Sequence, residues 1–212
     1  MDKFKNSDGR KILEAMVLGI QINKKYLSDI DGLTGDGDHG VNMNKGFSVF
    51  KERCLGEEIS FTQGLEELSG ILFNEIGGSM GPIYGTIFSA MADEGKEYEE
   101  LGSRELAQML ENGYRELTEI IEAKPGDKTI VDTLYPAVNA LRQASETESS
   151  FKNALEKMKL AANEGKNSTK DMKARFGRSS RLGDRSIGVL DAGAVSCCIL
   201  LESMADGIIQ LL

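Results

Sequence analysis

The stretch from Asp31 to Gly40, DGLTGDGDHG, places three carboxylates, four glycines and the only histidine of the chain within ten residues. It offers few apolar side chains for burial, so it does not suit a core strand. Its glycines allow positive φ angles and let a ligand approach the backbone closely. Carboxylate oxygens are hard ligands that suit Mg²⁺ or Ca²⁺. The stretch therefore predicts a cation-binding loop, and an acidic surface turn is the alternative interpretation.

The residues that follow this loop, VNMNKGF (41–47), predict the start of a helix that continues to about Cys54. The N-terminus of a helix carries free N–H groups and a positive partial charge, so it favours an anion. Metal ligands beside an anion site suggest Mg²⁺-bound phosphates. An EF-hand loop fits poorly, because its twelfth position, counted from Asp31, would be Asn42 instead of glutamate. A P-loop motif does not occur in the sequence.

Composition limits the possible classes of protein. The chain has 212 residues, 40% of them hydrophobic and 28% charged, which predicts one large globular domain over residues 1–212. The formal net charge of −9 argues against a nucleic-acid partner. We see no apolar run that approaches the roughly 18 residues of a membrane helix and no signal peptide, so we expect a cytoplasmic protein without a membrane partner. Three cysteines give neither a disulfide framework nor metal-ligand spacing.

Apolar residues recur at helical spacing through nearly the whole chain, and no alternation typical of a strand persists. The predicted fold class is all-α: a single domain of about eight antiparallel amphipathic helices. Ser103 is the expected N-cap of the fifth helix, and Ser149 or Ser150 that of the seventh. The predicted helices cover approximately residues 12–27, 40–54, 65–76, 83–94, 103–121, 131–145, 150–162 and 193–211.

The loops richest in glycine and charge follow the first, third and fifth of these helices, and a basic segment at 170–185 follows the seventh. If the helices alternate up and down, loops after odd-numbered helices lie at the same end of the bundle. The sequence therefore predicts a functional site at one end, where these four segments meet.

Four motifs in these segments carry a family resemblance. They are Asp31 with DGDHGVNM (36–43), GGSMGP (77–82), PGDKT (125–129), and GR (177–178) with SIG (186–188) and DAGA (191–194). In their order and spacing the chain resembles the nucleotide-binding L subunits of dihydroxyacetone kinases over essentially its whole length. The resemblance implies a closed eight-helix barrel that holds ADP or ATP at one end through two Mg²⁺ ions.

The resemblance also implies roles for individual residues. Asp31, Asp36 and Asp38 match the metal ligands. No side chain is assigned as catalytic, because phosphoryl transfer depends mainly on positioning and charge neutralisation. The residues that match the nucleotide site are His39, Gly40, Val41, Asn42, Ser79, Met80, Ile130, Arg178, Asp191, Ala192 and Gly193.

Two basic residues have alternative interpretations. Arg178 is a candidate fork donor to a phosphate, and a solvated basic loop is its alternative. Lys128 is expected either to contact a phosphate or to pair with Asp127 or Asp132.

By the same resemblance the chain is a phosphotransferase subunit. A separate K subunit binds a short-chain ketose, the L subunit delivers the phosphoryl group, and an M subunit of the phosphotransferase system recharges the bound ADP. A homodimeric state is compatible with these partners. The alternatives are a paralogue acting on another triose or tetrulose, the nucleotide domain of a fatty-acid kinase, and a non-catalytic nucleotide-binding regulator. His39 argues against the fatty-acid kinase, whose relatives tend to carry threonine there.

Three positions depart from the family pattern. Met80 stands where a small residue is common, EIIE (119–122, including Ile121) replaces a glycine-rich stretch, and Ala192 replaces a proline. These departures concern the adenine and ribose contacts, and they suggest a paralogue that serves another ketose.

Overall fold

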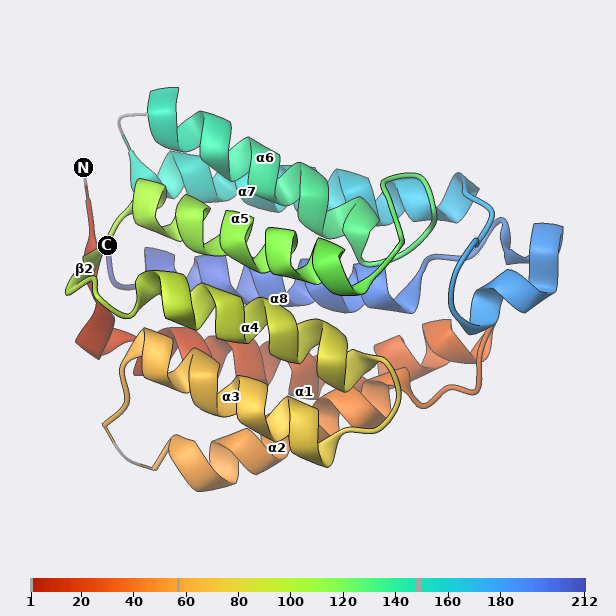
Figure 1. Cartoon of the computed structure of the whole chain (residues 1–212), viewed down its shortest axis with the longest axis horizontal. Coiled ribbons are helices and arrows are strands. Elements are labelled where there is room, and N and C mark those ends of the chain that lie inside the picture. The colour runs from red at the N-terminus through yellow and green to blue at the C-terminus, as the bar shows by residue number, and fades with distance from the viewer. Residues whose placement is uncertain (1, 57, 148–149) are drawn as a thin grey trace.

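The structure is a computed structural model that describes residues 2–56, 58–147 and 150–212. Within these residues it contains eight α-helices, so the predicted all-α class is confirmed (Figure 1). Three short 3₁₀ helices lie at Asn6–Asp8 (η1), Thr169–Asp171 (η2) and Arg178–Ser186 (η3). The α-helices are α1 (Arg10–Gly32), α2 (His39–Cys54), α3 (Phe61–Glu75), α4 (Met80–Gly95), α5 (Ser103–Ile120), α6 (Val131–Thr147), α7 (Phe151–Ser168) and α8 (Ala192–Ile209).

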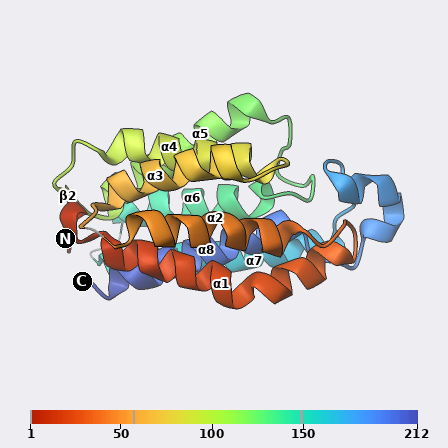
Figure 2. The same ribbon diagram turned by 90° about the horizontal axis from the view of Figure 1, so that it is seen from below.

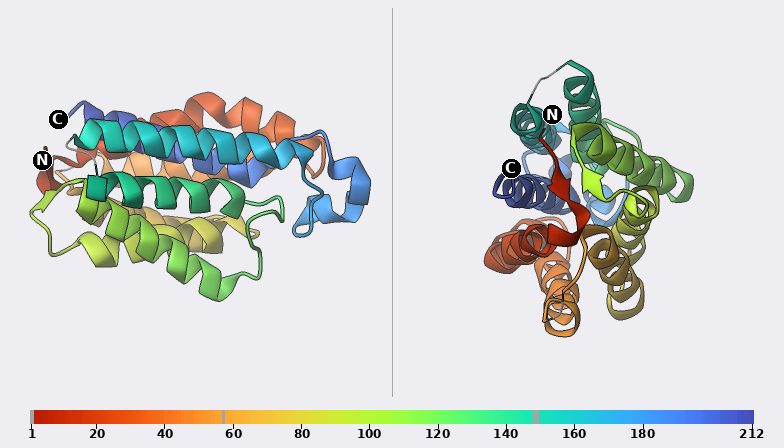
Figure 3. Two further views of the ribbon diagram at one scale, coloured as in Figure 1. Left: turned by 90° about the horizontal axis from the view of Figure 1, so that it is seen from above. Right: turned by 90° about the vertical axis from the view of Figure 1, so that its left-hand side faces the viewer.

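The helices form a closed ring, which Figure 3 shows end-on in its right-hand view. Each helix packs against the next one in the chain, and α1 packs against α8 to close the barrel. Since the helices alternate in direction, α2, α4, α6 and α8 all begin at the end where α1, α3, α5 and α7 finish. Figure 1 shows the connecting loops gathered at that right-hand end, with both termini at the opposite end. Figure 2 shows the same separation from below.

The ring encloses an apolar core to which the inner faces of the helices contribute. The largest fully buried side chains include Phe47, Phe50, Phe61 and Phe151, which come from three helices. Burial of each such side chain contributes about 1.5–3 kcal/mol. This packing fixes the helices against one another, and hence the loops that they carry.

Helix caps set several boundaries. Ser150 caps α7 by accepting a hydrogen bond from Asn153 N at 3.4 Å, as predicted; the alternative, Ser149, lies outside the described residues. The predicted cap of α5 is wrong by one residue, because Gly102 is the N-cap and Ser103 is the first helical residue. Glu105 secures that start by accepting a hydrogen bond from Gly102 N at 2.9 Å.

The prediction that the chain has no strand is wrong at one place. β1 (Phe4–Lys5) pairs antiparallel with β2 (Glu100–Leu101), with Phe4 opposite Leu101. Two-residue strands are too short to show the alternation by which a strand is recognised in a sequence. The pair ties the N-terminal segment to the connection between α4 and α5.

The expectation about apolar runs is also wrong, for α8. Its 18 residues have a mean hydropathy of 1.6, so by length and composition alone this helix could cross a membrane. In the fold, 61% of the window is buried inside the structure, and α8 packs against α1, α6 and α7. An apolar helix of this kind fits a barrel wall that contacts neighbours on several sides.

Candidate functional site

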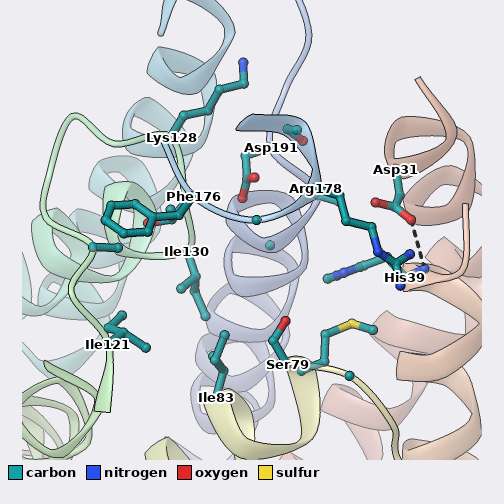
Figure 4. A pocket seen from close by; sticks show the side chains of 18 of the residues that line it. Asp31, His39, Ser79, Ile83, Ile121, Lys128, Ile130, Phe176, Arg178 and Asp191 are labelled. Atoms are coloured by element: carbon teal, nitrogen blue, oxygen red, sulfur yellow. Dashed lines mark hydrogen bonds between the residues drawn. The ribbon is translucent and has the colours of Figure 1, made fainter. Parts of the chain in front are cut away.

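A cavity of about 590 Å³ opens at the loop end of the barrel. Its lining comes from the loops after α1, α3 and α5 and from the segment before α8, so the predicted meeting of the four segments occurs (Figure 4). Four helices begin around it, and their N-termini direct free N–H groups and positive partial charge toward this end. The volume lies within the range of about 300–1,000 Å³ that is typical of small-molecule sites.

The acidic loop brings its three carboxylates together at one edge of the cavity. One oxygen atom from each of Asp31, Asp36 and Asp38 lies within 4.8 Å of the others. Gly37, at a φ of +75°, turns the chain between Asp36 and Asp38, and Gly35 N donates to Asp31 O at 2.6 Å. An all-oxygen, triply negative set fits Mg²⁺ or Ca²⁺ better than a softer metal.

Residues 170–188, which we call the arm, reach over this edge of the cavity. A guanidinium nitrogen of Arg178, Nη1, pairs with Asp36 and lies 3.6 Å from Asp38 Oδ1. The Ser179 hydroxyl donates to Thr34 Oγ1 at 2.9 Å. The guanidinium group of Arg178 thus places a positive charge between the carboxylates of Asp36 and Asp38. The arm therefore contacts the acidic loop through Arg178, which is about half exposed.

His39 is the first residue of α2, and its side chain is buried. Its Nε2 atom lies 2.8 Å from Ser196 Oγ, which in turn lies 2.6 Å from Tyr84 Oη. Tyr84 Oη also donates to Gly193 O at 3.3 Å. Burial lowers the pKa of His39 to about 4, against the opposing effect of the Asp31 charge, so the imidazole is neutral at pH 7. This buried chain of hydrogen bonds joins the starts of α2, α4 and α8.

Asp191 forms the N-cap of α8, with Oδ2 accepting a hydrogen bond from Ala194 N at 2.8 Å. Burial is the main cause that raises its pKa to about 6. Ala192 and Gly193 follow it along the cavity wall. The structure thus places all three predicted residues at the cavity, and gives Asp191 a structural role as the cap.

The glycine-rich loop and the opposite wall differ in character. Ser79 and Met80 line the cavity at the start of α4, and Ser79 has no side-chain hydrogen bond to the helix that it precedes. Figure 4 shows Ile121, Ile130 and Phe176 across the cavity from Asp31 and His39. The cavity therefore has a charged end and an apolar end, which suits a ligand with an anionic group and a planar apolar group.

Two predicted residues, Gly40 and Val41, do not line the cavity in the described part of the chain. A Cβ atom at Gly40 would lie 2.0 Å from Lys24 O, so this glycine allows α2 to pack closely against α1. Val41 is 50% exposed on the outside of α2. By contrast, Asn42 lines the cavity.

Lys128 lines the cavity, so its predicted contact with a phosphate stays a prediction, but it does not pair with Asp127 or Asp132. Its Nζ atom donates to Thr169 O at 2.6 Å and also to Val189 O. The two candidate partners are engaged elsewhere: Asp127 pairs with Arg175, and Asp132 accepts hydrogen bonds from backbone N–H groups.

The sequence did not reveal Tyr84, Ser196 or Phe176 as site residues. Tyr84 and Ser196 lie within apolar helical stretches, where their spacing matches that of core residues. A polar side chain on a core-facing position of a helix beside a glycine-rich loop is the signal that would have found Tyr84 and Ser196.

Comparison with known proteins shows the family of the chain. Residues 33–206 match the DAK2 domain, and the chain belongs to this family. It is 39% identical over 184 residues to the PEP-dependent dihydroxyacetone kinase, ADP-binding subunit DhaL, of Escherichia coli K12, covering 85% of this chain and 87% of that one. It is 37% identical to the corresponding subunit of kinase 1 of Listeria innocua, covering 87% and 88%. The predicted resemblance and the phosphotransferase class are thereby confirmed.

More distant relatives are longer proteins. L-erythrulose kinase of Pectobacterium atrosepticum is 28% identical, and the match covers 86% of this chain but 32% of that kinase. Among solved structures, dihydroxyacetone kinase from C. freundii in complex with AMP-PNP and Mg²⁺ has a TM-score of 0.74 at 19% identity. The match covers 97% of this chain and 35% of that kinase. The two proteins therefore share a fold over nearly the whole of this chain.

Proposed function

We propose that residues 1–212 form the nucleotide-binding phosphotransfer subunit of a dihydroxyacetone kinase. In this proposal the chain holds ADP or ATP through two Mg²⁺ ions and passes the phosphoryl group to a short-chain ketose bound on a separate K subunit. The observation that carries the proposal is a cavity with the Asp31, Asp36 and Asp38 cluster at one end and an apolar wall at the other. The names of the relatives, ADP-binding subunits of such kinases, agree with it.

The residues present fit Mg²⁺. Asp31, Asp36 and Asp38 would hold the ions, because their oxygen atoms already converge and a guanidinium lies between two of them. When bound, Mg²⁺ neutralises negative charge on phosphate oxygens, which phosphoryl transfer requires. The net charge of −9 makes such neutralisation necessary for any phosphate bound beside the cluster.

The chain's own groups would bind and orient the nucleotide. The starts of α2 and α4, with Asn42 and the Ser79 hydroxyl, would donate hydrogen bonds to phosphate oxygens. Arg178 would exchange its carboxylate partners for a phosphate, for which its planar fork is suited. The wall formed by Ile121 and Ile130 would pack against the base and exclude water from it.

We assign the recharging step to a phosphoprotein of the phosphotransferase system, an M subunit, and place the protein in the cytoplasm with that partner. The support is that the most similar relatives named above are dependent on phosphoenolpyruvate. A ketose other than dihydroxyacetone is the second candidate, because a kinase of L-erythrulose is also related at 28% identity.

Nucleotide content is the measurement that tests the proposal. The protein would be purified with Mg²⁺ and denatured, and the released nucleotide identified by chromatography and mass spectrometry. Near-stoichiometric ADP supports a trapped cofactor recharged by a phosphoprotein. An empty site that exchanges ATP readily points to an ATP-using subunit, and a site that binds no nucleotide contradicts the proposal. Transfer to dihydroxyacetone or erythrulose in the presence of a K-type partner then identifies the ketose.

A further inference from the structure

The arm is a closed loop with a narrow base. It leaves the barrel within η2 and returns just before α8, and it forms the protrusion at the right-hand end of Figure 1. At the base, Gly188 N donates to Lys170 O at 2.7 Å. Further along, Ala174 N donates to Ser186 Oγ at 2.9 Å and so ties the two sides together. Because the two ends meet, the position of the base sets the position of everything that the arm carries, including Arg178.

The ammonium group of Lys128 lies at this base. Its hydrogen bonds go to Thr169 O, where the chain enters the arm, and to Val189 O, where the chain leaves it. The side chain is 1% exposed, and in Figure 4 it extends away from the centre of the cavity. A buried ammonium group is costly unless its donors are satisfied. Here two of its three donors are satisfied, by carbonyl groups that belong to the two ends of the arm.

The backbone around Lys128 is arranged to direct this side chain. Among the described residues, Lys128 is the non-glycine residue with a positive φ, at +62°. That conformation is uncommon for a residue with a Cβ atom and persists where the surroundings impose it. Asp132 imposes it by accepting hydrogen bonds from Gly126 N at 2.5 Å and Thr129 N at 2.7 Å. The loop is thus held on both sides of Lys128.

The same loop also contacts the arm directly. Arg175 N donates to Asp127 O at 3.1 Å, and Arg175 Nε lies 3.4 Å from Asp127 Oδ1. The loop that precedes α6 is therefore the support on which the arm rests, and Lys128 is its buried contact.

We propose that Lys128 is a positioning residue for Arg178: its buried ammonium group holds the two ends of the arm together, so that the arm presents Arg178 to the acidic loop and to bound phosphate. The effect on phosphate rests on the proposed function, whereas the effect on the arm does not. Lys128 itself lines the cavity, and in this proposal its influence on nucleotide binding passes through Arg178.

The first test needs no ligand. Lys128→Met removes the ammonium group and keeps a long side chain, and Lys170→Met is the matched control because Lys170 is an exposed lysine at the base of the arm. Site-resolved amide hydrogen exchange is then measured at Ala174 and Gly188. We expect faster exchange at both amides in Lys128→Met and no change in Lys170→Met. Exchange unchanged in Lys128→Met would overturn the proposal.

The second test asks whether Lys128 acts through Arg178. Affinity for Mg·ADP is measured by calorimetry for Lys128→Met, Arg178→Gln and the double variant. We expect Lys128→Met alone to weaken binding about tenfold, or about 1.4 kcal/mol. In the Arg178→Gln background it should have no further effect, because the residue that it positions is gone. Equal losses in both backgrounds would overturn the proposal, since they would show a role independent of Arg178.

A milder variant keeps the test open if Lys128→Met does not fold. Lys128→Gln retains an amide donor, and it should give a smaller loss that again disappears in the Arg178→Gln background. The two tests also separate this inference from the proposed function. If the wild-type protein does not bind Mg·ADP, the proposed function fails, while the exchange rates at Ala174 and Gly188 still decide whether Lys128 holds the arm.

Discussion

The guanidinium group of Arg178 pairs with the carboxylate of Asp36, so the arm before α8 meets the loop after α1 across the mouth of the cavity. Asp38 lies 3.6 Å from the same nitrogen atom. A cation that binds to these carboxylates has to compete with Arg178. Bound phosphate, by contrast, offers Arg178 a new partner. The same side chain should therefore oppose a bare metal ion and favour a metal–nucleotide complex.

Arg178→Gln should change the two affinities in opposite directions. The ion pair is about half exposed, and such pairs contribute about 0–1 kcal/mol, so affinity for Mn²⁺ alone should rise by up to about fivefold. Affinity for Mg·ADP should fall by about tenfold or more, because a charge-assisted hydrogen bond is worth about 1.5–3 kcal/mol. Mn²⁺ binding followed by electron paramagnetic resonance and Mg·ADP calorimetry measure the two effects. Arg181→Gln, on the same arm, is the control, and a change of both affinities in one direction would contradict the expectation.

Asp36→Asn should abolish most of the metal and nucleotide binding. The substitution removes one of three converging negative charges, and affinity for a hard cation follows the number of charged ligands. We expect a loss on the order of a hundredfold for Mn²⁺ alone and for Mg·ADP. Asp29→Asn makes the same change on the exposed face of α1 and should leave both affinities unaltered. Unchanged nucleotide affinity in Asp36→Asn would remove Asp36 from the metal site.

The location of the site was predictable because it follows from chain order. Alternating helices bring every second loop to one end, and the charged and glycine-rich segments all follow odd-numbered helices. The Asp36 loop, the Gly77 loop and the Arg178 segment accordingly line or border one cavity. Helical periodicity likewise located all eight helices, since the core faces of a barrel repeat regularly, but it missed the observed ends of α1 and α7 by five and six residues.

Other features depend on contacts that no local pattern contains. Tyr84 and Ser196 resemble core residues until α4 and α8 are placed side by side, when their hydroxyl groups come within 2.6 Å. Lys128 follows an aspartate and precedes a threonine, which suggested a phosphate contact or a local ion pair. Its hydrogen-bond partners in the structure, the carbonyl groups of Thr169 and Val189, are backbone atoms at distant positions and have no signature in the sequence.

Tyr84→Phe should show what the buried hydrogen-bond chain contributes. It removes one hydroxyl group from a side chain that is 3% exposed and leaves Ser196 Oγ and Gly193 O with one partner fewer. A hydrogen bond contributes about 0.5–1.5 kcal/mol and Tyr84 makes two of them, so the free energy of unfolding should fall by about 1–3 kcal/mol. Urea denaturation measures it.

The same variant should also weaken Mg·ADP binding. Tyr84 is linked through Ser196 to His39, which is the first residue of α2, and the start of α2 would face the phosphates. Tyr114→Phe removes a tyrosine hydroxyl group on α5 that does not line the cavity, and it is the control. If the unfolding free energy and the Mg·ADP affinity both equal those of the wild type, the buried hydrogen bonds of Tyr84 do not support the site.

The ionisation of Asp191 makes the free energy of unfolding depend on pH. Its pKa in the folded protein is raised to about 6, mainly by burial, above the value of about 3.9 for an unperturbed aspartate. The folded protein therefore retains a proton that the unfolded chain has lost, and stability decreases as pH rises from about 4 through 6. Asp191→Asn removes this cost and keeps the cap of α8, because asparagine is as good an N-cap as aspartate.

The unfolding free energy of Asp191→Asn, compared with that of the wild type, should therefore increase between pH 4 and 7 by up to about 3 kcal/mol. Urea denaturation across this range measures the difference. Asp184→Asn is the control, and its effect on stability should have the opposite sign. The ion pair with Lys173 lowers the pKa of Asp184. Removing that carboxylate should therefore lower the free energy of unfolding above pH 4 and not below it. A difference between Asp191→Asn and the wild type that stays constant with pH would show that the carboxylate of Asp191 ionises freely in the folded protein, and that α8 begins on a charged cap at every pH in the range.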